Sequence, residues 1–376
     1  MVYVNIIGIA VLSVFVLFIV SKKNKVLSDY LLLLLIFFFF GILASGILLE
    51  YELTVLNYIV FLFYNSFIFP CFIIYGLVLL DPNQKFKITW LWTASYAIVF
   101  LVFVIIDTSL LNSYNTSAQL NALIESPSTV YYLFYKGQYL FVTILLLWFL
   151  RKLNKYRRDI KNSFSSIDAI HLGWFKNFTY IYLLVNIASL VLFVLLDLNL
   201  VSDIFIPLLI EHLILVLALF YLCFHGIKQY NLANLKTVSS NSGENGKLAI
   251  EKYSTSSLSE KEMRALFSQI GSLFENDRIY LDPELKIETI ANRLEVGNHK
   301  ISQTINTISK QSFYDFVNTY RVDHLKKLLK SEAHQKFTIL ALGLESGFNS
   351  KSSLNRIFKQ QVGMSPMTYQ KAQIIS

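Results

Sequence analysis

The amino-acid sequence predicts an all-α chain, in which a polytopic bundle of seven transmembrane helices precedes a cytoplasmic domain with two helix-turn-helix units. The first observation is composition: 55% of the 376 residues are hydrophobic, 15% are charged, and the mean hydropathy is +0.51. An average soluble domain has about 25% charged residues. The second observation is that long apolar runs stop near residue 225. The third is a helical repeat of apolar residues in the basic C-terminal third.

The seven spans are predicted from runs of about 20 apolar residues, the length with which a helix crosses a bilayer. They are Val2–Val20, Tyr30–Leu49, Val55–Leu80, Ile88–Ile106, Val130–Leu150, Phe175–Leu196 and Ile204–Phe224. The third contains Pro70, which a membrane helix accommodates as a kink. No basic residue precedes the first run, so we interpret it as a retained helix and not as a signal peptide.

The loop charges predict the orientation of this bundle. Lys and Arg follow the first, third and fifth spans, with six of them between Arg151 and Lys161. The loops Glu50–Thr54, Asp107–Thr129 and Asp197–Asp203 contain none. The positive-inside rule therefore places the N-terminus outside and the C-terminus in the cytoplasm. We expect a multi-pass protein of the bacterial cytoplasmic (inner) membrane, with its transmembrane domain over residues 1–230.

The residues after the bundle divide into a linker and a domain. Residues 231–258 form a predicted flexible linker, because Thr237–Ser257 is rich in Ser, Asn and Gly. Residues 259–376 form the predicted cytoplasmic domain. Its first helix starts at a capping box, in which Ser259 and Glu262 satisfy N–H groups at the helix start.

Two helix-turn-helix patterns follow, joined by the long helical segment SFYDFVNTYRVDHLKKLL. The first pattern spans residues 287–308, with its turn at Glu295-Val296-Gly297. The second has its turn at Ser346-Gly347-Phe348-Asn349. The predicted inward positions are Ile287, Ile290, Ala291, Leu294, Ile301, Ile305 and Ile308 in the first unit, and Ile339, Leu342, Gly343, Leu354, Ile357 and Phe358 in the second.

The stretch from Leu281 to Tyr369 resembles the DNA-binding domain of the AraC/XylS family. The resemblance rests on LKIETIANRL, YRVDHLKKLL and SGFNSKSSLNRIFKQQVGMSPMTY, and it covers about a quarter of the chain. Three positions depart from the family. Gly343 stands where a small Ala usually packs, Leu354 replaces a frequent Phe, and Gly297 stands where Ser often caps the recognition helix. Asn298 would then be the substitute cap.

The resemblance implies an AraC-type domain that binds specific DNA through the exposed start of each recognition helix. The candidate DNA-binding residues are Asn298, His299, Lys300, Gln303 and Thr304 in the first unit, and Ser350, Lys351, Ser352, Asn355 and Arg356 in the second. Of these, Lys300, Gln303, Lys351, Asn355 and Arg356 are the expected base readers.

Charge gives an independent argument for DNA binding. From Leu285 onward there are about twice as many Lys and Arg as Asp and Glu, which suits a surface that contacts phosphates. For Lys326, Lys327 and Lys330 both phosphate contact and a solvated helix face remain open.

Three residues in the predicted spans form a candidate signal pocket, because polar groups inside a membrane are costly. Lys136 and Glu211 lie at matching depth below the outer edge, with His212 next to Glu211. The alternative is that Lys136 reaches the interface and Glu211 is a structural hydrogen-bond acceptor.

The sequence provides no support for an enzyme. It has no HExxH, GxGxxG, P-loop or clustered carboxylates in the cytoplasmic part. Cys71 and Cys223 lie in apolar runs without metal-ligand spacing, so free buried cysteines are expected. We expect no cofactor, no metal site and no catalytic residue.

The leading hypothesis is a membrane-bound one-component transcription regulator, with the membrane domain as the signal input. The alternative is a membrane receptor or transporter-like protein whose helical tail is a protein-interaction module. Release of the tail by proteolysis within the linker is a third hypothesis. The expected partners are operator DNA, the lipid bilayer, a second copy of the chain and an unidentified signal ligand or membrane partner, with RNA polymerase as a further candidate.

Overall fold

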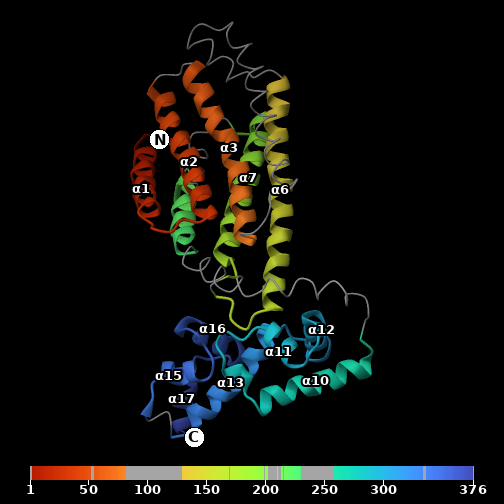
Figure 1. Ribbon diagram of the computed structural model, residues 1–376. Coiled ribbons are helices and arrows are strands. Elements are labelled where there is room, and N and C mark those ends of the chain that lie inside the picture. Colours follow the sequence, from red (N-terminus) through yellow and green to blue (C-terminus); the bar gives the residue numbers. More distant parts are fainter. Residues whose placement is uncertain are drawn as a thin grey trace. The chain divides into compact units, whose positions relative to one another are not determined.

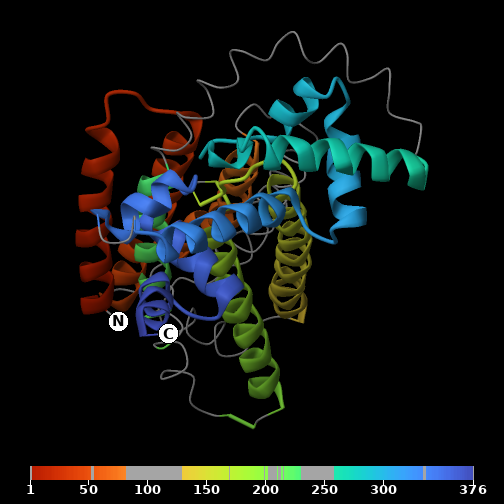
Figure 2. The ribbon, with the colours of Figure 1, turned by 90° about the horizontal axis from the view of Figure 1, so that it is seen from below.

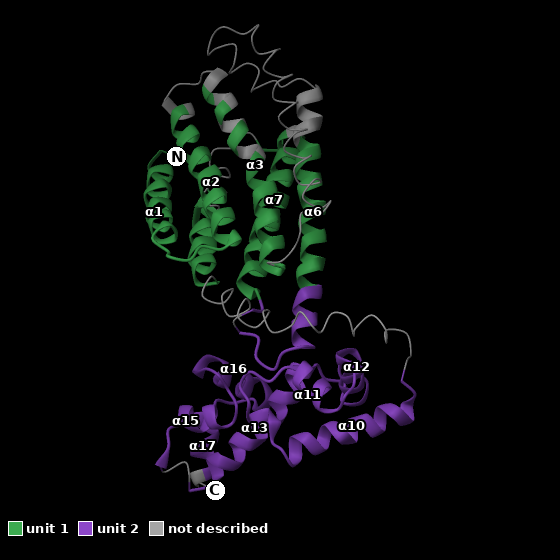
Figure 3. Cartoon of the chain, viewed as in Figure 1, with its two compact units in different colours: residues 1–154, 172–236 green, residues 155–171, 237–376 purple. Residues whose placement is uncertain are grey.

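The computed structural model describes residues 2–51, 55–81, 129–168, 170–198, 200–201, 210, 213–214, 216–229, 258–332 and 336–375, and its named secondary-structure elements in these ranges are helices. Two compact units divide the chain (Figure 3). Residues 1–154 and 172–236 form the N-terminal unit, and residues 155–171 and 237–376 form the C-terminal unit. Within the described ranges, the extended pairing consists of one isolated antiparallel bridge, between Phe164 and Lys286.

Long helices make up the described part of the N-terminal unit (Figure 1). They are α1 (Val2–Val20), α2 (Leu27–Tyr51), α3 (Val55–Leu80), α6 (Thr129–Lys161) and α7 (Gly173–Asp197). A shorter apolar helix covers Val216–Gln229. The prediction of helical runs is therefore confirmed where the structure describes them.

Among the residues that the structure describes, three helical segments are long and apolar enough to cross a membrane, as judged by length and composition. They are Val2–Val20, Leu27–Leu48 and Gly173–Leu196, and they overlap the first, second and sixth predicted spans. The fourth predicted span, Ile88–Ile106, lies outside the described residues, as does part of the seventh, Ile204–Phe224. The seven-span bundle therefore stays a prediction.

Helix α6 is longer than the apolar run that predicts it. It has 33 residues, or about 50 Å at 1.5 Å per residue, whereas the apolar run ends at Leu150. The basic residues after Leu150 continue the same helix, and those from Lys155 onward belong to the C-terminal unit. The predicted basic loop therefore begins as a helix.

Aromatic side chains fill the interior of the N-terminal unit. Phe72 of α3, Phe149 of α6 and Phe175 of α7 are buried and contact one another. Gly76 allows this approach, because a Cβ there would meet the Phe149 ring at 2.5 Å. The two cysteines are free and buried, as expected.

Large apolar side chains also cover the outer faces of these helices. Leu17 and Phe18 of α1 are 68% and 62% exposed, and Leu184 of α7 is 65% exposed. Only 22% of the Val2–Val20 window and 28% of the Gly173–Leu196 window is buried inside the unit. A face this apolar needs an apolar environment around it.

The C-terminal unit contains the shorter helices (Figures 1 and 2). They are α10 (Glu260–Glu275), the 3-10 turn η1 (Ile279–Leu281), α11 (Ile287–Arg293), α12 (Asn298–Ile308), α13 (Phe313–Lys330), α15 (Ile339–Glu345), α16 (Lys351–Val362) and α17 (Pro366–Ile375). Helix α13 runs between the α11–α12 pair and the α15–α16 pair in both views. The predicted linker lies outside the described residues except for Leu258.

Side-chain caps define where several of these helices begin. Ser259 and Glu262 form the predicted capping box at the start of α10. Ser312 caps α13, Thr338 caps α15 and Ser350 caps α16, each by accepting from a backbone N–H three residues on. The short polar residues before each apolar repeat therefore set the helix boundaries.

The two predicted helix-turn-helix turns, between α11 and α12 and between α15 and α16, share a backbone feature. In each, the second residue after the first helix has a positive φ, 54° at Glu295 and 90° at Gly347. A Cβ on Gly347 would also meet the Tyr280 carbonyl oxygen at 2.5 Å. The second turn therefore requires glycine for both conformation and space.

Two apolar clusters form the core of the C-terminal unit, and α13 contributes to both. Phe313, Phe316 and Val317 pack with α10, α11 and α12. From the same helix, Val322 and Leu325 pack with α15 and α16. Helix α13 thus fixes the α11–α12 pair to the α15–α16 pair.

The segment Lys155–His171 belongs to this second core, although chain order alone would place it with the predicted membrane domain. Its Ile160 and Ile167 are buried in the cluster that holds α13, α15 and α16. Two backbone hydrogen bonds attach it near the start of α11: Ser165 N–H donates to Leu285 O at 3.1 Å, and Ile287 N–H donates to Ser163 O at 3.0 Å. We call Lys155–His171 the clamp segment.

The glycine in the second turn provides a test of this packing. Gly347→Ala should lower the free energy of unfolding by more than about 1–2 kcal/mol, because the cost of a left-handed alanine adds to the clash with Tyr280. Gly363→Ala is the matched control: Gly363 has φ 82° but no atom within 4 Å of its Cβ position. Hydrogen exchange of the α13 amides measures both. Equal losses in the two variants would show that the close approach at Gly347 has no energetic effect.

Candidate nucleic-acid interface

The start of α12 exposes most of the residues predicted for the first unit. Asn298 and His299 are exposed, and Lys300 and Gln303 are partly exposed. The N-cap is Gly297, with no side-chain cap hydrogen bond, and Asn298 is already the first helical residue. The expectation that Asn298 caps this helix is therefore wrong.

Thr304 is predicted to face outward, and this prediction is wrong. Its side chain is 0% exposed, and its hydroxyl has no hydrogen-bond partner among the described residues. Helix α12 packs against α10, α11 and α13, so its buried arc is wider than the stripe marked by Ile301 and Ile305. Thr304 falls within that arc and does not face outward.

The start of α16 presents the residues of the second unit. Ser350 is the N-cap, with its hydroxyl accepting from Ser353 N–H at 3.1 Å. Lys351, Ser352, Asn355 and Arg356 are exposed on the first turns. Their polar groups can reach a partner that lies across the helix start.

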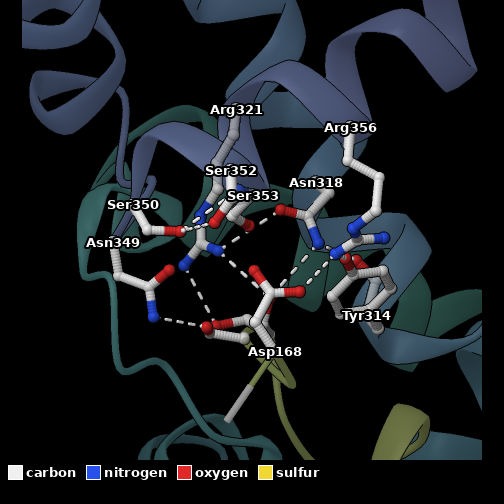
Figure 4. A network of polar contacts seen from close by, with 11 residues as sticks. Asp168, Tyr314, Asn318, Arg321, Asn349, Ser350, Ser352, Ser353 and Arg356 are labelled. Atoms are coloured by element: carbon white, nitrogen blue, oxygen red, sulfur yellow. Dashed lines mark hydrogen bonds and ion pairs between the residues drawn. The ribbon is translucent and has the colours of Figure 1, made fainter. Parts of the chain in front are cut away.

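Arg356 is the most constrained of these side chains (Figure 4). One guanidinium nitrogen donates to Asp168 Oδ1 of the clamp segment at 2.5 Å and to the Tyr314 hydroxyl at 2.9 Å. Burial alone would lower the pKa of Arg356, but the Tyr314 hydrogen bond and the Asp168 charge raise it above its ordinary value. The side chain is therefore a cation that is held toward the clamp segment.

Arg321 is a buried cation at the centre of the unit. It is 1% exposed, and it donates to the carbonyl oxygens of Tyr280 at 2.8 Å, Asp282 at 2.6 Å and Ser165 at 3.2 Å. The Ser165 hydroxyl accepts a further bond at 3.0 Å. Burial lowers the pKa of Arg321 to about 10, so the guanidinium is charged at neutral pH and its hydrogen bonds offset its desolvation.

The two departures from the family in the second unit compensate for each other. A Cβ on Gly343 would meet Leu354 Cδ2 at 2.5 Å, so the glycine accommodates this leucine between α15 and α16. Both residues are buried. Gly343 is expected to lower the stability of its helix, but its lack of a side chain makes room for Leu354.

The candidate signal pocket is described at one of its three positions. Lys136 is partly exposed on α6, whereas Glu211 and His212 lie outside the described residues. The structure shows a neutral polar contact that the sequence reading missed, in which Thr143 of α6 donates to the Asn186 amide oxygen of α7 at 2.8 Å. The described residues hold no group of three potential metal ligands.

Sequence reasoning also missed Asp168, Tyr314 and Arg321. Arg321 lies in the quoted segment YRVDHLKKLL, but an arginine in a basic helix is ordinarily solvated. Asp168 is separated from Arg356 by 188 positions. No local pattern signals either contact.

Comparison with known proteins supports the helix-turn-helix reading. Residues 290–372 match the model of a helix-turn-helix domain family, of the AraC type, which supports DNA-binding transcription regulation. No curated protein matches the chain. A structure from Listeria innocua, titled as a protein of unknown function, is similar over 28% of this chain and 95% of its own, with 21% identity and a TM-score of 0.25. A TM-score this low provides no evidence about the fold of this chain.

The buried hydroxyl of Thr304 gives a test of which side chains face outward. Thr304→Val should raise the free energy of unfolding by about 1 kcal/mol, since it removes a buried donor that lacks a partner, and it should leave binding to duplex DNA unchanged. Thr307→Val is the matched control, because Thr307 is exposed on the same helix. Thermal unfolding and fluorescence anisotropy measure the two effects. If Thr304→Val bound DNA more weakly and Thr307→Val did not, Thr304 would be a DNA-contacting residue after all.

Proposed function

We propose that this chain is a membrane-bound one-component transcription regulator, which binds specific DNA through its two helix-turn-helix units and receives its signal through the membrane domain. The observation that carries the proposal is the pair of recognition helices, α12 and α16, whose polar first turns are exposed within the region that matches the helix-turn-helix family. DNA-binding domains of this kind place such a helix start in the major groove.

The rigid connection between the units supports two-site recognition. Helix α13 is buried in both apolar clusters, so the recognition helices are held at a set separation. Two rigidly joined units suit successive major grooves about 34 Å apart on one face of the duplex. Lys326 of this helix pairs with Asp323 at 3.3 Å and is partly exposed. Both roles, phosphate contact and a solvated helix face, therefore stay open for this lysine.

Two properties of the N-terminal unit support a membrane location. Three of its described helical segments are long and apolar enough to cross a bilayer, and their outer faces carry exposed leucine and phenylalanine. The loop charges support a cytoplasmic C-terminus. The seven-span topology, the inner-membrane location, the domain bounds 1–230, 231–258 and 259–376, and a signal pocket at Lys136, Glu211 and His212 are parts of the proposal.

The proposal includes the partners that such a regulator needs. They are operator DNA, the bilayer, a second copy of the chain, RNA polymerase and a signal ligand or membrane partner. None of the described helices supplies a cluster of metal ligands, and the proposal assigns no catalytic step.

One observation favours the alternative, a receptor or transporter-like protein with a protein-interaction tail. Leu340 and Leu344 form an exposed apolar stripe on one face of α15, and Phe337, two residues before that helix, is also exposed. Such a stripe suits contact with another protein. Selective binding of duplex DNA by the full chain distinguishes the two functions.

Arg356 provides the test of specific DNA binding. Arg356→Ala should weaken binding to a duplex enriched from a random-sequence pool by about 1–3 kcal/mol, because an arginine that reads a base is lost. The measurement is fluorescence anisotropy of the full-length protein in lipid nanodiscs. A scrambled duplex of the same length reports non-specific binding.

The matched control is Lys359→Ala, which removes one positive charge from an exposed position on the same helix. It should weaken binding to the enriched and the scrambled duplex by the same factor, so that the ratio of the two affinities is unchanged. If Arg356→Ala also preserved the ratio, Arg356 would leave the base-reading set. If the unaltered protein enriched no sequence, specific DNA binding would be disproved.

Reporter fusions test the topology. Green fluorescent protein fused after residue 376 should fluoresce, and alkaline phosphatase inserted after Asn115 should be active, because the loop charges place these positions on opposite sides of the membrane. An active phosphatase fused at the C-terminus would show the opposite orientation. The C-terminal domain would then lie on the other side of the membrane from the DNA. Fractionation of the same cells checks that each fusion is in the membrane.

A further inference from the structure

The clamp segment, Lys155–His171, is bound to the C-terminal unit by contacts that are buried. Ser165 is 1% exposed, and its carbonyl oxygen accepts hydrogen bonds from the side chains of Asn318 and Arg321, each at 3.2 Å. Ile160 and Ile167 lie in the apolar cluster beneath α16. Buried, hydrogen-bonded contacts of this kind indicate a formed docking site and not a chance surface encounter.

The clamp segment also reaches the second recognition helix. Asn349, in the turn before α16, donates to the Ser166 hydroxyl at 2.6 Å, and Arg356 on α16 pairs with Asp168 at 2.5 Å. Figure 4 shows Asp168 directed at the Arg356 guanidinium from the clamp segment. Both contacts engage side chains at the end of the helix that would enter a groove.

The middle of the clamp segment and the start of the first predicted recognition helix line one cavity. Asn162, Ser163 and Phe164 line a cavity of 220 Å³ together with residues of α11 and of the start of α12. Two of those lining residues, Asn298 and His299, belong to the predicted DNA contact set. The clamp segment therefore contacts Arg356 of the second predicted contact set and borders a cavity at the first.

Charge makes the docked segment and DNA competitors. Arg356 is half exposed, but its guanidinium is already bonded to a carboxylate and to a tyrosine hydroxyl. Both bonds come from Nη2, and a bidentate contact with a base edge uses Nη2 together with Nε or Nη1. The Asp168 carboxylate would also lie close to phosphates, which it repels. Arg356 must therefore release Asp168 to read a base in the bidentate way.

From these contacts we propose that the clamp segment is an intramolecular inhibitor of the DNA-binding surface: docked, it occupies Arg356 on the second recognition helix and borders the start of the first, and DNA binds when it is displaced. The proposal rests on the proposed function and adds the device that regulates it. The clamp segment joins α6 to α7 directly in the chain. A rearrangement of those two helices is therefore transmitted to the DNA-binding surface without the linker 231–258.

The first test removes the carboxylate that holds Arg356. Asp168→Asn in the full-length protein in nanodiscs should bind the enriched duplex about 5-fold more tightly, which is the upper range for a partly exposed ion pair. Asp159→Asn is the matched control. Asp159 is exposed on the same segment, and its carboxylate makes no ion pair with any residue that the structure describes, so its loss alters the net charge alone.

The affinities of the three proteins decide the role of the ion pair. Tighter binding by Asp168→Asn than by Asp159→Asn supports the clamp. Equal affinities for both variants would show that Asp168 does not compete with DNA, and would overturn the proposal while leaving the proposed function intact. If neither variant nor the unaltered protein bound any duplex, the proposed function would fail and the inhibitor with it.

A second test locks the clamp segment in place. In a Cys71→Ser, Cys223→Ser background, Ser166→Cys and Asn349→Cys place two thiols where the present side chains are hydrogen-bonded. The oxidised protein should form a disulfide and bind the enriched duplex at least 10-fold more weakly than the reduced protein. The single Ser166→Cys variant, oxidised and reduced, is the control.

Each outcome of the locking test has one meaning. A disulfide that weakens DNA binding reversibly supports the proposal. A disulfide that leaves the affinity unchanged would show that the docked segment and DNA coexist, and would overturn it. Absence of a disulfide in the DNA-free protein would show that the segment is not docked, and would overturn it as well.

Discussion

The C-terminal unit is organised around the buried guanidinium of Arg321. A charged group that is 1% exposed is strongly destabilising unless every donor finds an acceptor. Here the acceptors come from three separate segments: the clamp segment at Ser165, the η1 turn at Tyr280 and Asp282, and the Asn318 amide on α13 itself. Since the clamp segment and the η1 turn are distant from α13 in the chain, the charge is satisfied only when both pack against this helix.

The second recognition helix depends on this arrangement. Gly347 passes so close to Arg321 that a Cβ would meet its Nε at 2.9 Å, and the turn that it forms leads directly into α16. The same helix that carries Arg321 also carries Tyr314, whose hydroxyl accepts from Arg356. Burial raises the pKa of Tyr314, so this hydroxyl stays protonated at neutral pH. The buried and the half-exposed arginines thus belong to one polar network, which connects the core to the predicted DNA-reading surface.

In the proposed function, the clamp segment would give a signal from the membrane domain a second route into the C-terminal unit. A flexible linker transmits little beyond proximity, whereas α6 continues without a break through Lys161 into the clamp segment. Energetic coupling between two sites requires an element with two arrangements that each site biases differently. The docked and displaced clamp segment would be that element, and the Asp168–Arg356 pair is a contact present in one arrangement and lost in the other.

The sequence by itself determined the features that depend on local repeats. The helical class, the apolar spans where they are described, the capping box at Ser259 and the two turns all follow from the spacing of apolar residues and from short polar or glycine residues at helix ends. The outward position of Arg356 followed from the same spacing. Its actual partner did not, because Asp168 is distant in the chain and lies in a loop that chain order places with the membrane domain.

Only the tertiary structure decided which side chains are covered, and by what. Thr304 is buried because α12 is packed on three sides, and Arg321 is buried because Ser165, 156 positions away, closes over it. Gly343 and Leu354, which look like two unrelated substitutions along the chain, are one contact. Helical periodicity reports the direction of a side chain relative to its own helix axis. Burial and pairing depend on the distant segments that surround that helix, and long-range packing alone brings those segments together.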